Sequence, residues 1–178
     1  MTIKDFVDYF ENVAKGNKII SHATPQDRVA FKRIDIEDVI NGIRSDLEGV
    51  SMYLESPEIK PADALSDNPR KLFKGAFLIM KPVDVSDVDQ ILEALDICQT
   101  VCDQILAKIL NDLKKHKINS LHPFKIKGFN VGSVDMQKVG PIFGNSYGYR
   151  FTFTLDQTFT SNLILDQADW YSDTPFKI

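Results

Sequence analysis

The stretch that decides the fold is SDVDQILEALDICQTVCDQILAKILNDLKKH, which runs from Ser86 to His116. Its apolar residues recur at steps of three and four, and this spacing predicts a single amphipathic helix. The apolar stripe consists of Val88, Ile91, Leu92, Leu95, Cys98, Cys102, Ile105, Leu106, Ile109 and Leu113. Ser86 is the predicted N-cap; acids open the first turn and lysines close the last, which suits the helix dipole. At 1.5 Å per residue the helix spans roughly 45 Å, enough to cross a whole sheet.

The composition is that of a globular protein with one sizeable core. The 178 residues are 43% hydrophobic and 26% charged, which is enough for one domain without disulfides or a metal. A net charge of -4 argues against a general nucleic-acid binder, because such proteins carry a basic face. We expect no signal peptide, no membrane span and synthesis in a reducing cytoplasm. A zinc site needs four ligands, and Cys98 and Cys102 have no second ligand pair in the sequence. The two cysteines are therefore predicted to be core residues.

Before the long helix, two helices and two strands are predicted. Ile3–Ala14 and Asp35–Glu48 show helical spacing, and a short strand is possible within residues 26–34. Residues 50–55 alternate as a half-buried strand does, and residues 72–81 contain an apolar run typical of a strand covered on both faces.

Two long connections interrupt the predicted strands. Ser56–Arg70 contains several prolines and is predicted to be a loop that reaches a neighbouring molecule. After the helix, residues 124–131 and 134–136 are predicted strands, with bulges where glycines break the alternation. A glycine-rich loop is expected over residues 140–149, and Tyr147–Leu155 has the clearest strand alternation in the chain.

This order predicts an α+β fold: a mostly antiparallel sheet, with the long helix and an amino-terminal helix packed on one face. Residues 1–156 form the predicted single domain, and residues 157–178 an extended carboxy-terminal arm. The arm carries many apolar groups, which either fold back on this domain or lie on another subunit. These groups are Leu163, Ile164, Leu165, Trp170, Tyr171 and Phe176.

No catalytic, cofactor-binding or metal-binding motif is found, and we expect a protein that is not an enzyme. The histidines His22, His116 and His122 lie in different elements and are predicted to be surface or hydrogen-bonded residues. The acids of the long helix are predicted to form its solvated face. They are Asp84, Asp87, Asp89, Glu93 and Asp96.

The order of elements resembles that of phage tail-terminator and tail-completion proteins and of related neck-ring proteins. The matching stretches are the helix Ile3–Ala14, the strands Val50–Glu55 and Leu72–Lys81, the helix Ser86–His116 and the strand Tyr147–Leu155. The resemblance implies a structural subunit, made in the host cytoplasm, that forms a homo-oligomeric ring at the head–tail junction or tail end. It also implies neighbouring neck or tail proteins as partners, and DNA passing through the lumen without specific binding.

Intersubunit contacts are expected from the proline-rich loop, the glycine-rich loop and the arm. The expected interface residues are Pro57, Pro61, Phe143, Tyr147, Leu163, Ile164, Trp170 and Tyr171. Two other interpretations stay open. One is a small cytoplasmic enzyme or ligand-binding domain whose site is built from scattered acidic residues, and the other is an adaptor that binds one partner through its tail.

Overall fold

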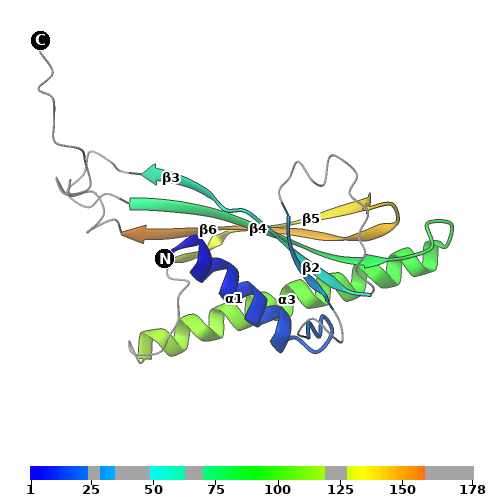
Figure 1. The fold of residues 1–178 in the computed structure, drawn as a ribbon, viewed down its shortest axis with the longest axis horizontal. Coiled ribbons are helices and arrows are strands. Elements are labelled where there is room, and N and C mark those ends of the chain that lie inside the picture. The colour runs from blue at the N-terminus through cyan, green and yellow to red at the C-terminus, as the bar shows by residue number, and fades with distance from the viewer. Residues whose placement is uncertain (24–28, 35–48, 63–69, 119–127, 159–178) are drawn as a thin grey trace, which may run out of the picture.

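The computed structural model describes residues 1–23, 29–34, 49–62, 70–118 and 128–158. In these residues two helices lie on one face of a six-stranded sheet, as Figure 1 shows. The helices are α1 (Ile3–Gly16) and α3 (Val88–Ile118). The strands are β1 (Phe31–Ile34), β2 (Ser51–Glu55), β3 (Glu58–Ala62), β4 (Arg70–Pro82), β5 (Phe129–Ile142) and β6 (Ser146–Thr158).

The sheet is mostly antiparallel. Its order is β1-β2-β4-β6-β5, and β3 pairs with the first part of β4. Only β1 and β2 run parallel among these described pairs. The predicted α+β class is therefore confirmed. The short strand expected within residues 26–34 is present as β1.

The main core lies between the sheet and the two helices, and it is rich in aromatic rings. Phe10 of α1 contacts the rings of Phe77 and Phe153, each at a centroid distance of 5.5 Å. Phe77 in turn stacks on Phe151 at 4.7 Å. From α3 the buried apolar residues are Ala94, Leu95, Cys98, Val101, Cys102, Ile105 and Ile109. The helix stripe and the alternation of β6 thus face each other, as the sequence predicts.

The apolar run in β4 is buried on both faces over residues 75–80, as predicted. Its odd-numbered residues face the helices, whereas Leu78 and Met80 belong to a second, smaller cluster on the other face. That cluster also contains Ile34, Tyr53 and Phe143. Both sides of the central strand therefore contribute apolar burial, which explains why it lacks polar alternation.

The prediction of a long loop after residue 55 is wrong over its first part. β2 and β3 follow one another along the same edge of β4, with partners Leu54↔Phe77 and Glu58↔Lys74. This one-residue change of register is a bulge at Ser56 and Pro57, where a residue without an N–H breaks the ladder at no cost. Pro61 lies within β3, an edge position that proline tolerates.

The bulge predicted after residue 128 is confirmed, but the two strands expected there are one strand, β5. Its register against β6 shifts between Asn130 and Asp135. Ser133 bridges the gap: its hydroxyl donates to the Asn130 carbonyl (2.7 Å) and accepts from the Thr154 N–H (2.8 Å). A side chain thus replaces the missing backbone partner of β6.

The glycine-rich loop is shorter than predicted. β5 extends to Ile142 and β6 begins at Ser146, so only three residues form the turn. Phe143 and Gly144 there have positive φ angles of 53° and 92°. Left-handed backbone closes a hairpin tightly, which is why a long loop is unnecessary.

Both helix starts follow capping rules, although one cap was assigned to the wrong residue. Thr2 and Asp5 form a capping box on α1. On α3 the cap is Asp87, whose carboxylate accepts from the N–H groups of Asp89 (3.0 Å) and Gln90 (3.1 Å). Ser86 lies one residue before this cap, and its hydroxyl donates to Asp84 at 2.7 Å.

Four predicted features lie wholly or partly outside the described residues. They are the helix over 35–48, the loop at residues 63–69, the strand at residues 124–127 and the carboxy-terminal arm at residues 159–178. β6 runs to Thr158, so the last strand passes the expected domain boundary at residue 156.

A glycine at the centre of the core leads to the first testable prediction. A Cβ added at Gly75 would lie 2.6 Å from Cζ of Phe153 and 3.0 Å from Cζ of Phe6. Overpacking of this kind costs about 1–3 kcal/mol. We expect Gly75→Ala to lower the free energy of unfolding by that amount in urea denaturation.

The control is Gly16→Ala at the end of α1, where an added Cβ has no neighbour within 4 Å. It should leave stability unchanged or raise it slightly, because alanine favours helix over glycine. Equal stabilities for Gly75→Ala and the wild type would contradict the described packing.

Candidate functional site

One pocket lies on the sheet face away from α3. It is an open groove of about 290 Å³, floored by β4 and β6. The end of β2, the start of β3 and the β5 bulge provide its sides. The charged residues that line it are Glu55, Glu58, Lys74 and Arg150, and its hydroxyl groups come from Ser56, Ser133, Thr152 and Thr154.

A bidentate ion pair between Arg150 and Glu55 spans this groove. The Arg150 guanidinium donates from Nε to Oε1 of Glu55 (2.6 Å) and from Nη2 to Oε2 (2.7 Å). Glu55 is only 11% exposed, and its hydrogen bonds raise the pKa of Arg150 above the ordinary value. The pair fixes β6 to β2 across the intervening strand β4.

The remaining charges of the groove are also paired. Glu58 contacts Lys60 at 2.7 Å and Lys74 at 3.7 Å. The hydrogen bond from Lys60 is the main reason that the pKa of Glu58 lies below its usual range. Each acid in the groove thus has a basic partner from this chain, and the pairs of Glu55 with Arg150 and of Glu58 with Lys74 connect strands of the sheet.

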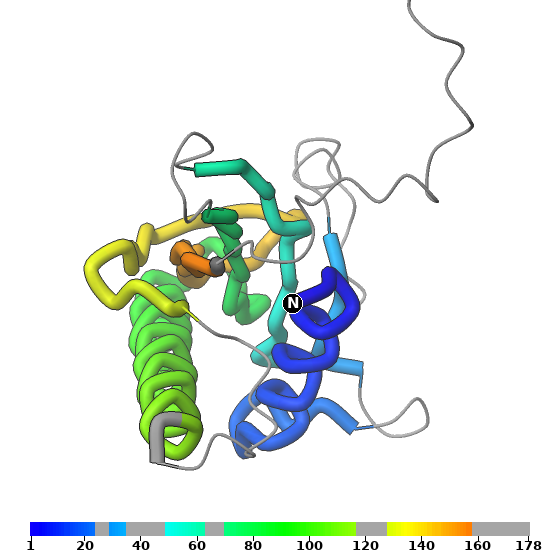
Figure 2. The backbone as a smooth tube through the Cα atoms, turned by 90° about the vertical axis from the view of Figure 1, so that its left-hand side faces the viewer, coloured from blue at the N-terminus to red at the C-terminus, as the bar shows by residue number. Residues whose placement is uncertain are grey.

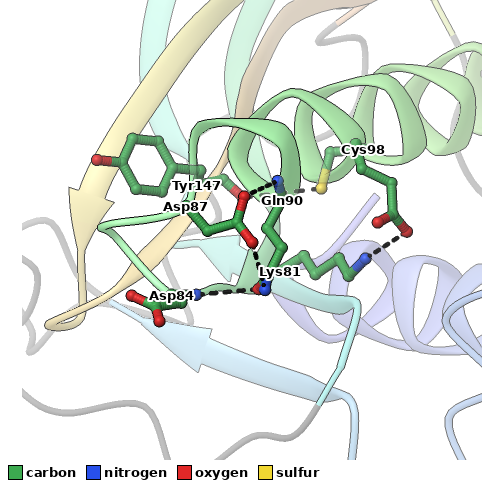
Figure 3. A network of polar contacts seen from close by, with 7 residues as sticks. Lys81, Asp84, Asp87, Gln90, Cys98 and Tyr147 are labelled. Atoms are coloured by element: carbon green, nitrogen blue, oxygen red, sulfur yellow. Dashed lines mark hydrogen bonds and ion pairs between the residues drawn. The ribbon is translucent and has the colours of Figure 1, made fainter.

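The acids at the start of α3 do not enter the groove, because they lie with the helix on the opposite side of the sheet. Figure 3 shows the contacts of Asp84 and Asp87 with Gln90. Asp84 accepts hydrogen bonds from Ser86, which lower the pKa of its carboxyl group, and Asp87 caps the helix. Glu93 pairs with Lys81 at 3.0 Å. These contacts shape the turn into α3 and connect the helix to β4.

The two cysteines are buried, unbridged core residues, as predicted. The thiol of Cys98 donates to the carbonyl oxygen of Tyr147 at 3.8 Å. Burial raises the pKa of each thiol to about 12, so both are protonated at neutral pH. A protonated, enclosed thiol is neither a nucleophile nor a metal ligand.

One buried acid escaped the sequence analysis. Asp112 on α3 is 4% exposed and accepts a hydrogen bond from the Tyr9 hydroxyl at 3.1 Å. The Lys108 ammonium also donates to it, one turn away on α3. Burial, and then the Asp112 charge, raise the pKa of Tyr9. The sequence contained one indication of this burial, because Asp112 lies three residues after Ile109 and so on the same face as the apolar stripe. The hydrogen bond between Tyr9 and Asp112 connects α1 to α3.

The histidines fit the prediction as far as the structure describes them. His22 accepts at Nδ1 from the N–H of Ala30 (3.2 Å) and lies 4.0 Å from Glu11. His116 is half-buried in the last turns of α3, and His122 lies outside the described residues. In the part of the chain that the structure covers, no group of three or more His, Cys, Asp or Glu is placed to hold a metal ion.

An exposed apolar surface lies at the start of α3. It includes Val88 and Leu92, which the helical spacing had assigned to the buried stripe. Val85, Val88 and Leu92 are 51%, 66% and 56% exposed; we call these three residues the α3 patch. Leu92 lies about 160° around the helix from Asp112, which faces α1, at 100° per residue. Figure 1 shows this end of α3 at the edge of the molecule, beyond the labelled strands. No described element covers it.

The expected interface residues fall in three groups. Pro57 is half-buried at the bulge, and Pro61 is exposed on the β3 edge. Phe143 is 8% exposed and stacks on Tyr53 at 4.7 Å, so its ring packs within this chain. Tyr147 is half-buried at the start of β6. The arm residues Leu163, Ile164, Trp170 and Tyr171 lie outside the described residues.

Comparison with protein-family models, with curated proteins and with solved structures finds no match to this chain. Neither α1 nor α3, the helices that the structure describes, is long and apolar enough to cross a membrane. The interpretation of function therefore depends on the surfaces of the molecule.

The burial of the thiols predicts how stability changes with pH. An unfolded thiol ionises near pH 9, whereas the folded ones ionise near pH 12. A pKa raised in the folded state stabilises the fold at neutral pH, and that contribution is lost as the pH rises between these values. We expect a loss of roughly 1 kcal/mol per thiol by about pH 10.

The measurement is chemical denaturation at several pH values, compared with a Cys98→Ala, Cys102→Ala variant. The variant is less stable at neutral pH, because it loses packing, but its stability should fall less steeply above pH 8.5. Parallel pH profiles for the two proteins would contradict the protonated, buried state of the thiols.

Proposed function

We propose that this protein is a structural subunit that assembles with copies of itself into a ring, at the head–tail junction or tail end of a phage-like virion. The observation that carries the proposal is that the described part of the chain has two unlike sides, each with a sheet edge that no described strand covers. Figure 2 shows α3 and the first part of β5 on one side and α1 and β1 on the other. Within the described sheet, β5 pairs only with β6, and β1 only with β2.

Two unlike sides suit a head-to-tail contact, in which one surface meets a different surface on the next copy. Such contacts close into a ring when the rotation between copies divides a full turn. Open sheet edges and exposed apolar groups are the usual sites of such contacts. The α3 patch provides apolar area on the first side, and Val29, 46% exposed beside β1, provides some on the second.

The virion setting comes from the resemblance in the order of elements. In that setting the partners are further copies of the chain and the neck or tail proteins above and below the ring. The net charge of -4 suits a lumen through which DNA passes without binding, because phosphate contacts need basic residues.

The experiment is to measure particle mass in solution and to image the assembly. We expect native mass spectrometry to give a fixed multiple of the monomer mass, and negative-stain images to show rings with a central hole. A monomer at every concentration tested would overturn the proposal.

A single substitution tests whether the α3 patch takes part in the contact. Leu92→Asp places a carboxylate where a neighbour would have to desolvate it, so we expect monomers at concentrations where the wild type forms rings. Ala107→Asp is the matched control, because it adds the same charge at an exposed position of the same helix. Rings formed equally well by both variants would exclude the patch from the contact.

The virion setting has its own test. Mass spectrometry of purified phage particles that encode this chain should detect it at a constant copy number. If rings form in solution but the particles lack the chain, the virion setting is wrong and the ring stands.

A further inference from the structure

We propose that the start of α3 docks onto the β1 edge of the next copy, with the acidic side chains beside the α3 patch facing Lys32 and Arg33. The inference rests on the proposed ring and identifies the two surfaces that meet in it. It is carried by the opposite charges of two exposed, partly apolar surfaces on opposite sides of one chain.

The first surface is the flank of α3 that includes the α3 patch. Asp89, Asp96 and Asp103 recur at steps of seven, so they form one row along this helix. All three are exposed, and within the described residues none of them makes an ion pair. Leu92 lies beside this row, since Asp96 is one turn further along. The surface is therefore an apolar centre with an acidic border that has no ion-pair partner among the described residues.

The second surface, which we call the β1 edge, consists of Val29, Lys32 and Arg33. Lys32 and Arg33 are exposed, and neither has an ion-pair partner in the part of the chain that the structure describes. Because neighbouring side chains of a strand point to opposite faces, the two cations border the edge on both sides. Val29 adds an exposed apolar group two residues before the strand.

The two surfaces complement each other in apolar area and in charge. Apolar groups meet at the centre, and opposite charges meet at the border, where they set register and exclude wrong partners. The elements that carry the two surfaces, α3 and β1, lie on opposite sides of the molecule (Figure 2), and no ion pair joins the two surfaces within the described residues of one copy. A second copy placed head to tail satisfies both, and leaves the same two surfaces open at its ends.

The test exchanges charges between the surfaces. One variant carries Asp89→Lys with Asp96→Lys, and another carries Lys32→Glu with Arg33→Glu. In each variant the contact brings like charges together, so we expect only monomers in native mass spectrometry where the wild type assembles. An equimolar mixture of the two should assemble again, in alternation, and so should a chain with all four changes.

The control variant is Lys114→Glu with Lys115→Glu, which reverses two exposed cations at the other end of α3. It makes the same change of net charge as the β1-edge variant, and we expect it to assemble as the wild type does. Circular dichroism on every variant verifies that α1 and α3 are intact. If a variant does not fold, the salt dependence of the wild type provides the test: its assembly should weaken as ionic strength rises from about 0.05 M to about 1 M.

Each outcome separates this inference from the proposed function. If the wild type forms rings and both charge variants do so equally, the two surfaces are wrong and the ring stands. Failure of the mixture and of the fourfold variant to assemble overturns the pairing of these surfaces. A wild type that stays monomeric overturns the ring, and the docking with it.

Discussion

The structure depends on the long pairing between β4 and β6. It runs from Arg70↔Thr158 to Pro82↔Ser146 without a shift in register. Every second side chain along it therefore faces the same way, and together they form one continuous apolar surface. Two close approaches require glycine in this ladder: a Cβ at Gly148 would lie 1.9 Å from the Ile79 carbonyl oxygen, and one at Gly75 would meet Phe153. A surface this long can be covered only by an element of similar length, and α3 is that element.

The sequence was informative wherever one residue pattern serves one element. The alternation of Tyr147–Leu155, the run in β4 and the stripe of α3 each reflect a single face against the core. β3 was missed because Pro57 and Pro61 look like loop residues. Whether a proline disrupts a strand depends on which side its missing N–H would face, and that is decided by a partner strand far away in the sequence. The loop over residues 140–149 was predicted too long for the same reason, because Pro141 looks like a loop residue but lies within β5.

The errors on α3 have a related cause. A helical stripe predicts which residues share a face, but not how far the covering sheet extends. Val88 and Leu92 lie where no described element covers them, whereas Asp112 lies where α1 covers the helix and supplies the Tyr9 hydroxyl. Periodicity alone therefore assigned two exposed residues to the core and overlooked a buried acid. The groove was equally hidden, since the pairing of Glu55 with Arg150 depends on strand order.

The distribution of satisfied and unsatisfied groups in the described residues suggests where binding energy remains available. Glu55, Glu58 and Asp112 are each paired within the chain. The α3 patch and the β1 edge differ, because apolar area and unpaired charge occur there together. A contact between copies would bury the first and neutralise the second in one step. Since the two surfaces are unlike and face opposite ways, the same step can repeat until the twist between copies closes the ring.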